Sequence, residues 1–485
     1  MADVPQKTIY WYDYETFGAT PRVDRLAQFG GVRTDEALNI IGAPLMLYCK
    51  LADDYLPQPI SSLITGITPQ KVNEVGLPEV AFIRRIHAEF SQPNTCVTGY
   101  NNLRFDDEFT RYSLYRNFLD PYGREWRNGN SRWDLVDVVR LTRALRPEGI
   151  VWPNYDDGRP SLRLEDLTVA NQISHTAAHD ALSDVYATIA LARLIRDQQP
   201  KLYDYVFQHR FKNSVLTMLN LKEQKPVIHV SGMYPTERGN MAVVIPVAAH
   251  PTNKNGVIVY DLSQNPEPLF KLKPEKIHER IFTATEDLPK GVERIPLKTV
   301  HANKCPVVVP FTTLTSQAAK RYGIDINLCK SHLDMIIHGP PLREKIQKVF
   351  SVTEFEARSD PDDQLYGGPF FNDDDRQRMN HIHTLSPQEL VGYTPSFSDP
   401  RLEEMLFRYR ARNFPESLTT DEKMRWQAFR AARFTQAEPE RLTATQYFAE
   451  LTQLQQVPER TAAELQILDA LYLYGQQLTT PYRFD

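Results

Sequence analysis

Two acidic residues near the N-terminus are the first side chains that could do chemistry. Asp13 and Glu15 lie in the aromatic-rich run from Tyr10 to Gly18, whose composition is typical of a buried strand ended by a glycine. Successive side chains on a strand point to opposite faces, so the two carboxylates share one face. Neighbouring carboxylates repel each other and are costly to bury unless a cation lies between them. The spacing predicts a metal site, with a solvated edge strand as the alternative for so short a motif.

A third carboxylate follows a later strand. Residues 96–101 have the composition of a strand, and residues 104–118 have the pattern of a helix. Asp106 then lies at the C-terminal edge of the strand, where open α/β sheets place their ligands. The alternative is an ordinary helix cap or first-turn acid, and Asp107 and Glu108 compete with Asp106 for either role.

A histidine and an acid stand at the start of a strong helical pattern over residues 177–198. Five positions turn roughly 500° around a helix, so His179 and Asp184 cannot face one point from mid-helix. They can do so if His179 lies at the frayed start and Asp184 one turn inside. Asp180 is a local rival, because it lies four positions before Asp184. A capping histidine and a surface acid remain the simpler explanation of this motif alone.

A stretch rich in arginine follows Asp106. Nine arginines and no lysine occur between residues 104 and 146, interleaved with aromatic residues. Guanidinium groups bind phosphates and aromatic faces stack on bases, so the mixture suits a track for single-stranded nucleic acid. We expect Arg111, Tyr122, Trp126 and Arg140 to contact the strand. The alternative is that several aromatics belong to the core and several arginines pair with acids. These acids are Asp120, Glu125, Asp134 and Asp137.

The elements that must position these residues form an α/β domain. Three strand-like runs follow one another through short turns and indicate the opening of a mixed sheet. They are residues 7–14, 25–35 and 44–51. The helical patterns of this part are at 68–75, 78–91, 104–118, 162–173 and 177–198.

The pattern changes after residue 200. Short β-type runs separated by turn residues, at 227–231, 241–249 and 256–262, indicate a small antiparallel barrel. Clusters of proline, aspartate and glycine predict a long linker at 352–400. Helical periodicity then indicates a helical bundle over 402–412, 420–434, 444–454 and 461–478. We therefore expect three domains, at 1–200, 201–352 and 353–485.

The charge distribution points to a polyanionic partner despite a net charge of −5. Residues 201–360 hold 22 basic and 16 acidic side chains, whereas both flanking parts are acidic. A local basic field can steer a polyanion even when the total charge is negative. Lys254, Lys298, Lys304 and Arg321 are the candidate contacts, with a solvated basic surface as the alternative.

Composition excludes several other classes of protein. The four cysteines stand far apart without a C-x-x-C pair, so neither a disulfide framework nor a zinc ribbon is indicated. No charged-then-apolar leader opens the sequence, and no apolar run is long enough to span a membrane. We expect a cytoplasmic protein without a membrane partner.

Taken in order, the acidic residues and the histidine resemble the three motifs of the DEDD exonuclease superfamily, histidine subclass. Within it, the chain is similar to the bacterial exodeoxyribonuclease I family, through segments that span all three parts. These segments are Asp13–Gly18 (DYETFG), Asn130–Asp134 (NSRWD), Ala144–Ile150 (ALRPEGI), His179–Thr188 (HDALSDVYAT), Val230–Met233 (VSGM) and Tyr409–Pro415 (YRARNFP). Phe17 stands where most relatives carry a second threonine, and residues 451–485 are the least recognisable.

The resemblance implies a fold and a set of contacts. The first domain would have a ribonuclease H-like fold, and the second would be a Src homology 3-like barrel with attached helices. Glu15 and Arg163 would bind the 3′-terminal nucleotide, and Leu63–Thr68 would line its pocket. The implied partner is the acidic C-terminal tail of the bacterial single-stranded DNA-binding protein, with Arg146 and Tyr205 as candidate contacts.

The chemistry can be argued from the residues themselves. Phosphodiester hydrolysis needs an in-line water and charge stabilisation at the attacking and leaving oxygens, which two divalent cations about 4 Å apart supply. Oxygen ligands suit Mg²⁺, or Mn²⁺, better than zinc. We expect Asp13, Glu15 and Asp184 as inner ligands, with Asp13 bridging, and Asp106 on the second ion. His179 is the expected general base, because an imidazole titrates near neutrality.

Together with this chemistry, the resemblance implies an exodeoxyribonuclease that degrades single-stranded DNA in the 3′→5′ direction, releases 5′-mononucleotides and acts in DNA repair and recombination. Basic and helical modules beside the nuclease could hold the strand after each cut and make digestion processive. A 3′→5′ exoribonuclease is one alternative, since only contacts at the 2′ position discriminate RNA from DNA. A non-catalytic single-strand-binding protein is another. A chain with its own flanking modules is expected to be a monomer.

Overall fold

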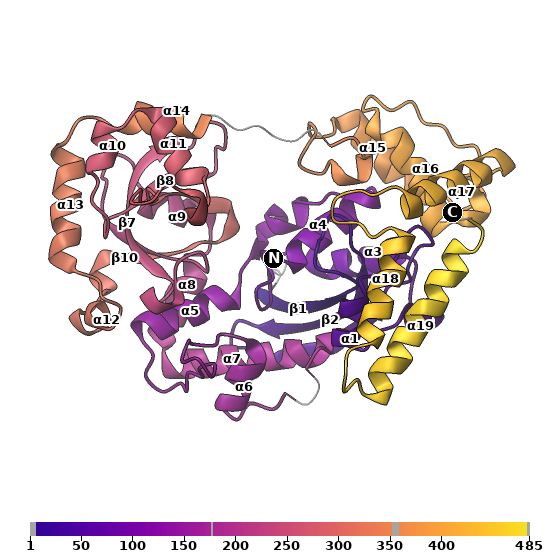
Figure 1. Cartoon of the computed structure of the whole chain (residues 1–485), viewed down its shortest axis with the longest axis horizontal. Coiled ribbons are helices and arrows are strands. Elements are labelled where there is room, and N and C mark those ends of the chain that lie inside the picture. The colour runs from indigo at the N-terminus through magenta and orange to yellow at the C-terminus, as the bar shows by residue number, and fades with distance from the viewer. Residues whose placement is uncertain (1–5, 176–177, 352–357, 483–485) are drawn as a thin grey trace, which may run out of the picture. The chain divides into compact units, whose positions relative to one another are not determined.

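The computed structural model describes residues 6–175, 178–351 and 358–482, which fold into two compact units (Figure 1). The described part of the first unit is residues 6–131, 178–186 and 358–482, and that of the second is residues 132–175 and 187–351. The three predicted domains are consecutive along the chain, whereas each of these units is built from separate stretches of it. Helix α7 (Ala181–Gln198) therefore begins in the first unit and ends in the second.

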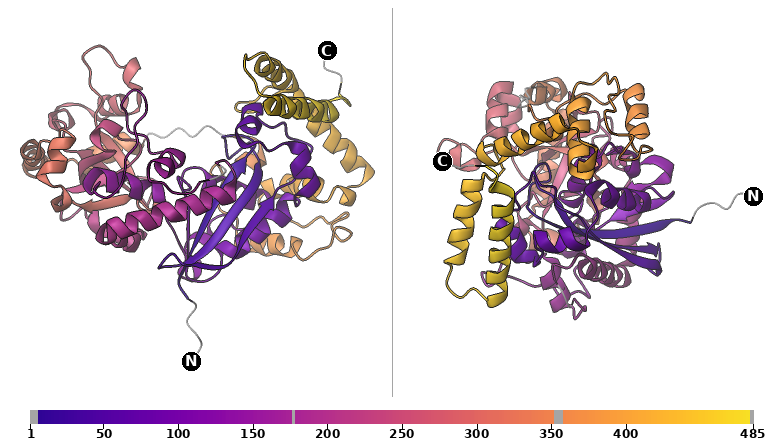
Figure 2. Two further views of the ribbon diagram at one scale, coloured as in Figure 1. Left: turned by 90° about the horizontal axis from the view of Figure 1, so that it is seen from below. Right: turned by 90° about the vertical axis from the view of Figure 1, so that its right-hand side faces the viewer.

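A five-stranded mixed sheet forms the centre of the first unit, in the order β3-β2-β1-β4-β5. Strand β1 pairs antiparallel with β2 and parallel with β4, and β2 pairs antiparallel with β3. The long strands β1 and β2 run side by side in the left view of Figure 2. The strands are β1 (Thr8–Thr16), β2 (Leu26–Asp35), β3 (Ile40–Tyr48), β4 (Thr95–Thr98) and β5 (Ser131–Arg132). The predicted mixed sheet is thus confirmed.

Successive side chains of β1 point to opposite faces of the sheet, and the two faces have different surroundings. Tyr10, Tyr12 and Tyr14 enter a core of aromatic and aliphatic side chains, in which Tyr12 and Phe90 approach to 4.8 Å between ring centres. Burial of such rings is worth about 1.5–3 kcal/mol each, so this face holds the strand in place. Asp13 and Glu15 belong to the opposite face, as their spacing predicts.

The first four helices of the chain follow the predicted patterns closely, except that α1 was not predicted. They are α1 (Pro59–Thr65), α2 (Pro69–Val75), α3 (Glu79–Phe90) and α4 (Asp106–Arg116). Pro59 and Pro69 lie in the first turns of α1 and α2, where their fixed φ and missing N–H are tolerated.

The C-terminal helices complete the core of the first unit. They are α15 (Asp373–Ile382), α16 (Arg401–Asn413), α17 (Thr420–Thr435), α18 (Ala444–Gln455) and α19 (Ala462–Thr479). Helices α18 and α19 run side by side (Figures 1 and 2), and Leu468 and Leu471 of α19 share a buried cluster with Phe17 at the end of β1. The predicted helical periodicity after residue 400 is confirmed.

The prediction of a long linker at 352–400 is wrong for the described residues 358–400. This stretch contains α15, and Leu365, Met379 and Leu390 are buried against Tyr112 and Tyr115 of α4. Its many aspartates and prolines suggest an open loop, but several of the aspartates are buried in ion pairs. Residues 352–357 lie outside the described residues.

A buried ion cluster holds the start of this stretch. The guanidinium of Arg412, on α16, donates to Asp362 at 2.7 Å and to Asp54 at 2.8 Å. Burial acts to raise the pKa of Asp54, but the guanidinium groups of Arg412 and Arg433 outweigh it and hold the pKa well below its usual range. The cluster thus joins loops far apart in the sequence through charges that are nearly inaccessible to water.

The second unit contains an antiparallel sheet in the order β10-β6-β7-β8-β9. Its strands are β6 (Val227–Val230), β7 (Met241–Ala249), β8 (Gly256–Asp261), β9 (Leu297–His301) and β10 (Val307–Pro310). Strands β6, β7 and β8 coincide with the three predicted runs, whereas β9 and β10 were not predicted.

Short helices accompany this sheet. They are α5 (Leu135–Leu145), α6 (Leu164–Ala170), α8 (Pro200–Gln208), α9 (Lys212–Met218), α10 (Glu267–Lys271), α11 (Pro274–Phe282), α12 (Ser316–Arg321), α13 (Ile326–His338) and α14 (Arg343–Ser351). Among the described residues of the whole chain, no helix combines the length and the apolar character needed to cross a membrane.

Replacing Arg412 by alanine should lower the free energy of unfolding by about 3–5 kcal/mol, because the change removes the nearest guanidinium group from the buried carboxylates of Asp54 and Asp362. Urea denaturation measures this loss. Arg425→Ala is the matched control: Arg425 lies on α17, pairs with Glu404 and is 55% exposed, so its removal should cost less than about 1 kcal/mol. Equal losses in the two variants would contradict the large contribution to stability that we assign to the buried ion cluster.

Candidate active site

Three predicted residues converge beside the central sheet. One ligand atom each of Glu15, His179 and Asp184 lie within 4.8 Å of one another. Glu15 is buried on β1, and the other two come from the start of α7. Two carboxylates this close repel each other, and the burial of Glu15 increases the cost. A divalent cation would relieve that repulsion, so the two carboxylates fit a hard metal ion.

The backbone at His179 explains how histidine and acid can face one point. His179 has φ +65°, in the left-handed region, and stands in the turn just before α7. Asp184 lies in the first turn of the helix. This is the arrangement that the spacing requires. A left-handed histidine costs roughly 1–3 kcal/mol, so its surroundings must fix it.

Asp180, the predicted rival of Asp184, has a structural task. Its Oδ1 accepts the N–H of Ser183 at 3.1 Å, which caps the start of α7, and its Oδ2 accepts a hydrogen bond from the side chain of Gln28 at 3.0 Å. Both oxygens are therefore occupied by protein donors.

Asp106 and Asp107, the two competing acids, differ in their contacts. Asp107 accepts the hydroxyl of Tyr12 at 2.7 Å and pairs with the buried Arg124 at 2.8 Å. Burial, followed by the charge of Asp107, raises the pKa of Tyr12 and keeps its hydroxyl a donor. Asp106 instead accepts the backbone N–H of Tyr14 at 3.2 Å, which places it against the strand between Asp13 and Glu15.

Asp13 stands outside the group of three, although it shares a strand face with Glu15. It is half-buried, and its register partner is Gly30 on β2. The last parallel pair between β1 and β4 is Trp11 with Thr98, so both acids lie beyond the end of β4. This is the C-terminal edge at which the site was predicted.

Part of the arginine-rich stretch is engaged in ion pairs. Arg111 is buried and bound to Glu125 at 2.8 Å, and Arg140 is bound to Asp137 at 2.5 Å. Arg127 contacts Asp120 at 2.9 Å. These pairings match the alternative stated for this stretch. Trp126 differs, since it is 65% exposed with Arg127 over its ring.

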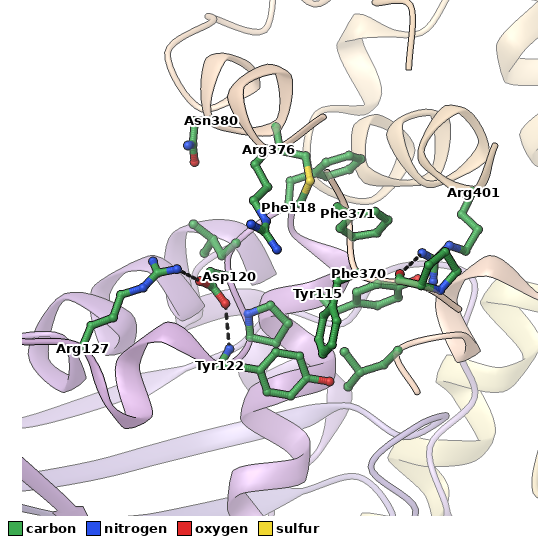
Figure 3. A pocket seen from close by; sticks show the side chains of 15 residues that line it. Tyr115, Phe118, Asp120, Tyr122, Arg127, Phe370, Phe371, Arg376, Asn380 and Arg401 are labelled. Atoms are coloured by element: carbon green, nitrogen blue, oxygen red, sulfur yellow. Dashed lines mark hydrogen bonds and ion pairs between the residues drawn. The ribbon is translucent and has the colours of Figure 1, made fainter. Parts of the chain in front are cut away.

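A cavity of about 170 Å³ lies next to this stretch (Figure 3). Its walls include Tyr122 and Phe370, whose ring centres are 5.9 Å apart, and Tyr115 stacked on Phe371. Arg127 and Arg376 also line it, as Figure 3 shows. The cavity combines aromatic faces with cations, which is the chemistry that a nucleotide needs.

The remaining predicted contacts lie elsewhere. Arg163 is exposed, precedes α6 and contacts Glu165 at 3.4 Å. Lys254, Lys304 and Arg321 are exposed on the second unit, whereas Lys298 donates to Ser231 at 2.8 Å. The segment Leu63–Thr68 forms the end of α1 and the turn into α2.

The two residues proposed to bind a partner's acidic tail are half-buried in the second unit. Arg146 donates to the carbonyl of Leu145 at 2.6 Å. Tyr205 stacks on His209 with ring centres 4.0 Å apart.

Two residues near the site were not predicted. A Cβ atom on Gly30 would lie 2.5 Å from the backbone of Ala181 and of Leu182, so only glycine lets the start of α7 approach β2 this closely. Gln28 is buried beside Glu15 and bonds to Asp180. Both lie on β2, in the stretch 26–32 (LAQFGGV), where Gln28 is the one polar side chain, but the sequence does not show what packs on them.

Known protein families and relatives match nearly the whole chain. Three family models match: Exonuclease at residues 10–192, Exonuclease I SH3-like domain at 210–352, and Exonuclease I C-terminal domain at 359–478. Exodeoxyribonuclease I of Escherichia coli K12 is 47% identical over 98% of this chain and 98% of its own length.

Two solved structures are similar throughout. A moderately thermophilic exonuclease I from Methylocaldum szegediense has a TM-score of 0.93 at 53% identity, covering 97% of this chain and 99% of its own. The zinc-bound form of the E. coli exonuclease I complex with single-stranded DNA has a TM-score of 0.92 at 46% identity, covering 98% and 100%.

Gly30→Ala should weaken Mn²⁺ binding about 10-fold or more, because the added methyl group pushes His179 and Asp184 away from Glu15. Isothermal titration calorimetry measures the affinity. Gly367→Ala is the matched control, since its nearest neighbour would be 3.8 Å away. Unchanged affinity in folded Gly30→Ala protein would contradict the close approach of α7 as the feature that sets the site.

Proposed function

This chain belongs to the exodeoxyribonuclease I family, and on that premise we propose that it removes 5′-mononucleotides from the 3′ end of single-stranded DNA. The observation that carries the proposal is the convergence of Glu15, His179 and Asp184, with Asp106 held against the same strand. An exodeoxyribonuclease of this family hydrolyses phosphodiesters, and the site has the acids and the base that such hydrolysis needs.

The roles of the residues follow from their chemistry. Water attacks the terminal phosphorus, a new P–O bond forms, and the bond to the 3′ oxygen of the preceding nucleotide breaks. His179 takes the proton of the attacking water, and the departing 3′ oxygen takes one from solvent. The imidazole suits this task because its ordinary pKa lies near neutrality. Glu15 and Arg163 bind the terminal nucleotide.

The site depends on a divalent metal, and we propose that Asp13, Glu15 and Asp184 hold one ion and Asp106 a second. Carboxylate oxygens are the ligands that hard cations prefer in proteins. Mg²⁺ is the ion proposed, with Mn²⁺ as a substitute. When bound, the two ions stabilise charge on the attacking and leaving oxygens.

The strand upstream of the cut has a second contact on the first unit. Trp126 offers an exposed ring for stacking, and the cavity lined by Tyr122 and Phe370 can take a base, while Arg127 and Arg376 in its wall face the phosphate of that nucleotide (Figure 3). Arg111 supports Tyr122 from 5.5 Å, Arg140 is neutralised by Asp137, and the exposed lysines Lys254 and Lys304 of the second unit add positive charge. Holding the strand between cuts makes digestion processive.

The cellular setting is proposed from the family resemblance. The protein acts as a cytoplasmic monomer in DNA repair and recombination, and the acidic tail of the single-stranded DNA-binding protein binds near Arg146 and Tyr205. We propose that residues 1–200, 201–352 and 353–485 are three domains with separate roles. Truncation after Pro200 does not test these roles, because the C-terminal helices complete the core that contains Phe17.

Digestion of end-labelled single-stranded DNA, duplex DNA and RNA tests the reaction. Wild type should release the 3′ label of single-stranded DNA first, with Mg²⁺ and not with EDTA. His179→Ala should lower turnover by roughly 10²–10⁴-fold with little change in DNA affinity, as expected for loss of a general base. Preference for RNA would indicate an exoribonuclease, and tight binding without cleavage would contradict an enzymatic role.

Trp126→Ala should reduce the number of nucleotides removed per encounter, because stacking on an aromatic ring is worth about 1–3 kcal/mol per base. Digestion of a long labelled strand in the presence of a heparin trap measures that number. Tyr472→Ala, on α19, removes an exposed ring far along the chain and serves as control. Equal run lengths for Trp126→Ala and wild type would exclude Trp126 from the track.

A further inference from the structure

We propose that Gln28 is a positioning residue for the reaction: its side-chain amide fixes the turn that carries His179 to β2, the strand paired with the one that carries Glu15. The effect that we expect on kcat rests on the proposed function. Its structural basis is independent of the substrate, because it concerns how two elements are joined.

The contacts of Gln28 lie directly after His179 in the chain. The Nε2 of Gln28 donates to Oδ2 of Asp180 at 3.0 Å, and its Oε1 accepts the backbone N–H of Ala181 at 3.2 Å. Gln28 is 1% exposed, so water does not compete for either bond. One side chain thus binds both residues that follow the histidine.

The position of Gln28 on β2 aligns this bond with the site. Gln28 is the register partner of Glu15 in the antiparallel pair of β1 and β2. Side chains of paired residues point to the same face of a sheet and lie about 5 Å apart at Cβ. The amide therefore ties the turn to the sheet next to Glu15 itself.

The amide has one favourable orientation. With Nε2 toward the Asp180 carboxylate and Oε1 toward the Ala181 N–H, a donor meets an acceptor at each end. The reversed amide would place a carbonyl against a carboxylate and an NH₂ against an N–H. On the Nε2 side, the hydroxyl of Tyr48 at 3.2 Å and the sulfur of Met46 at 3.3 Å are further neighbours.

This bond explains how a costly backbone conformation persists. His179 adopts φ +65°, which a histidine does not favour, and the residue after it is Asp180. Asp180 is held at both carboxylate oxygens, by Ser183 from the helix and by Gln28 from the sheet. Without Gln28 the cap on α7 would survive, but the hydrogen bonds that join this turn to β2 would be lost.

Loss of the Gln28 hydrogen bonds should lower kcat. Gln28 does not supply a group to the reaction, and displacing the turn by about 1 Å would misplace His179 and Asp184 relative to Glu15. Misplacement of this size typically costs about 10²-fold in rate. Contacts with the rest of the DNA strand are made elsewhere, so the KM for a long oligonucleotide should change little.

A reciprocal exchange tests the proposal. Gln28→Glu faces Asp180 with a second carboxylate, and Asp180→Asn faces Gln28 with a second amide, so each single variant should lose about 10–100-fold in kcat. The double variant Gln28→Glu/Asp180→Asn restores a donor opposite an acceptor, with the roles reversed. The N–H of Ser183 keeps its cap in this variant, because the amide oxygen of the introduced asparagine also accepts. The kcat of the double variant should recover to within several-fold of wild type.

Controls separate positioning from folding. Gln28→Met keeps the length of the side chain without hydrogen bonds and should lower kcat with KM within about twofold. Gln70→Met, at an exposed glutamine that donates to the carbonyl of Ala470, should leave both constants unchanged. Thermal unfolding of every variant shows whether it is folded at the assay temperature.

Mn²⁺ affinity, measured by electron paramagnetic resonance, gives a readout that does not need DNA. Gln28→Met should weaken binding about 10-fold, and the double variant should recover it. If wild type does not cut DNA, the proposed function fails while this measurement still decides the inference. A folded double variant no better than the two single variants, in kcat and in Mn²⁺ affinity, would overturn it.

Discussion

Repulsion between the carboxylates of Glu15 and Asp184 is the constraint on which the structure of the site depends. Their ligand atoms lie within 4.8 Å of each other and of His179, in surroundings that bury Glu15. Such a group does not form by its own attraction, so the fold must bring it together. Gly30 does this by letting the backbone of α7 reach β2, and the aromatic face of β1 keeps the strand fixed from behind.

The same logic extends to the C-terminal helices. They bury the end of β1 through Phe17, and the ion cluster around Arg412 ties residues 360–363 to Asp54. The strand that carries Asp13 and Glu15 is therefore braced by helices close to the C-terminus of the chain. A nuclease domain of the predicted bounds 1–200 would lack this support, which gives the helical part a structural task besides any contact with DNA.

Much of the fold could be predicted, because periodicity records local structure. The C-terminal helices and β6–β8 coincide with their patterns, and the site at the end of β4 follows from the order of strand and helix. Contacts between distant parts of the sequence could not be predicted. Asp106 and Asp107 are adjacent acids, yet Asp106 accepts a hydrogen bond from the backbone of Tyr14 whereas Asp107 pairs with Arg124. Arg111 and Trp126 likewise have similar sequence settings, yet one is buried in ion pairs and the other exposed.

The most direct test of the metal centre is a crystal of the wild-type protein soaked with Mn²⁺ and a short oligonucleotide, measured at a wavelength where manganese scatters anomalously. We expect an anomalous peak within about 2.0–2.6 Å of carboxylate oxygens of Glu15 and Asp184, with the 3′-terminal phosphate beside it. A peak at other residues, or none in crystals whose dissolved protein still degrades DNA with Mn²⁺, would contradict the central claim that these acids hold the ion.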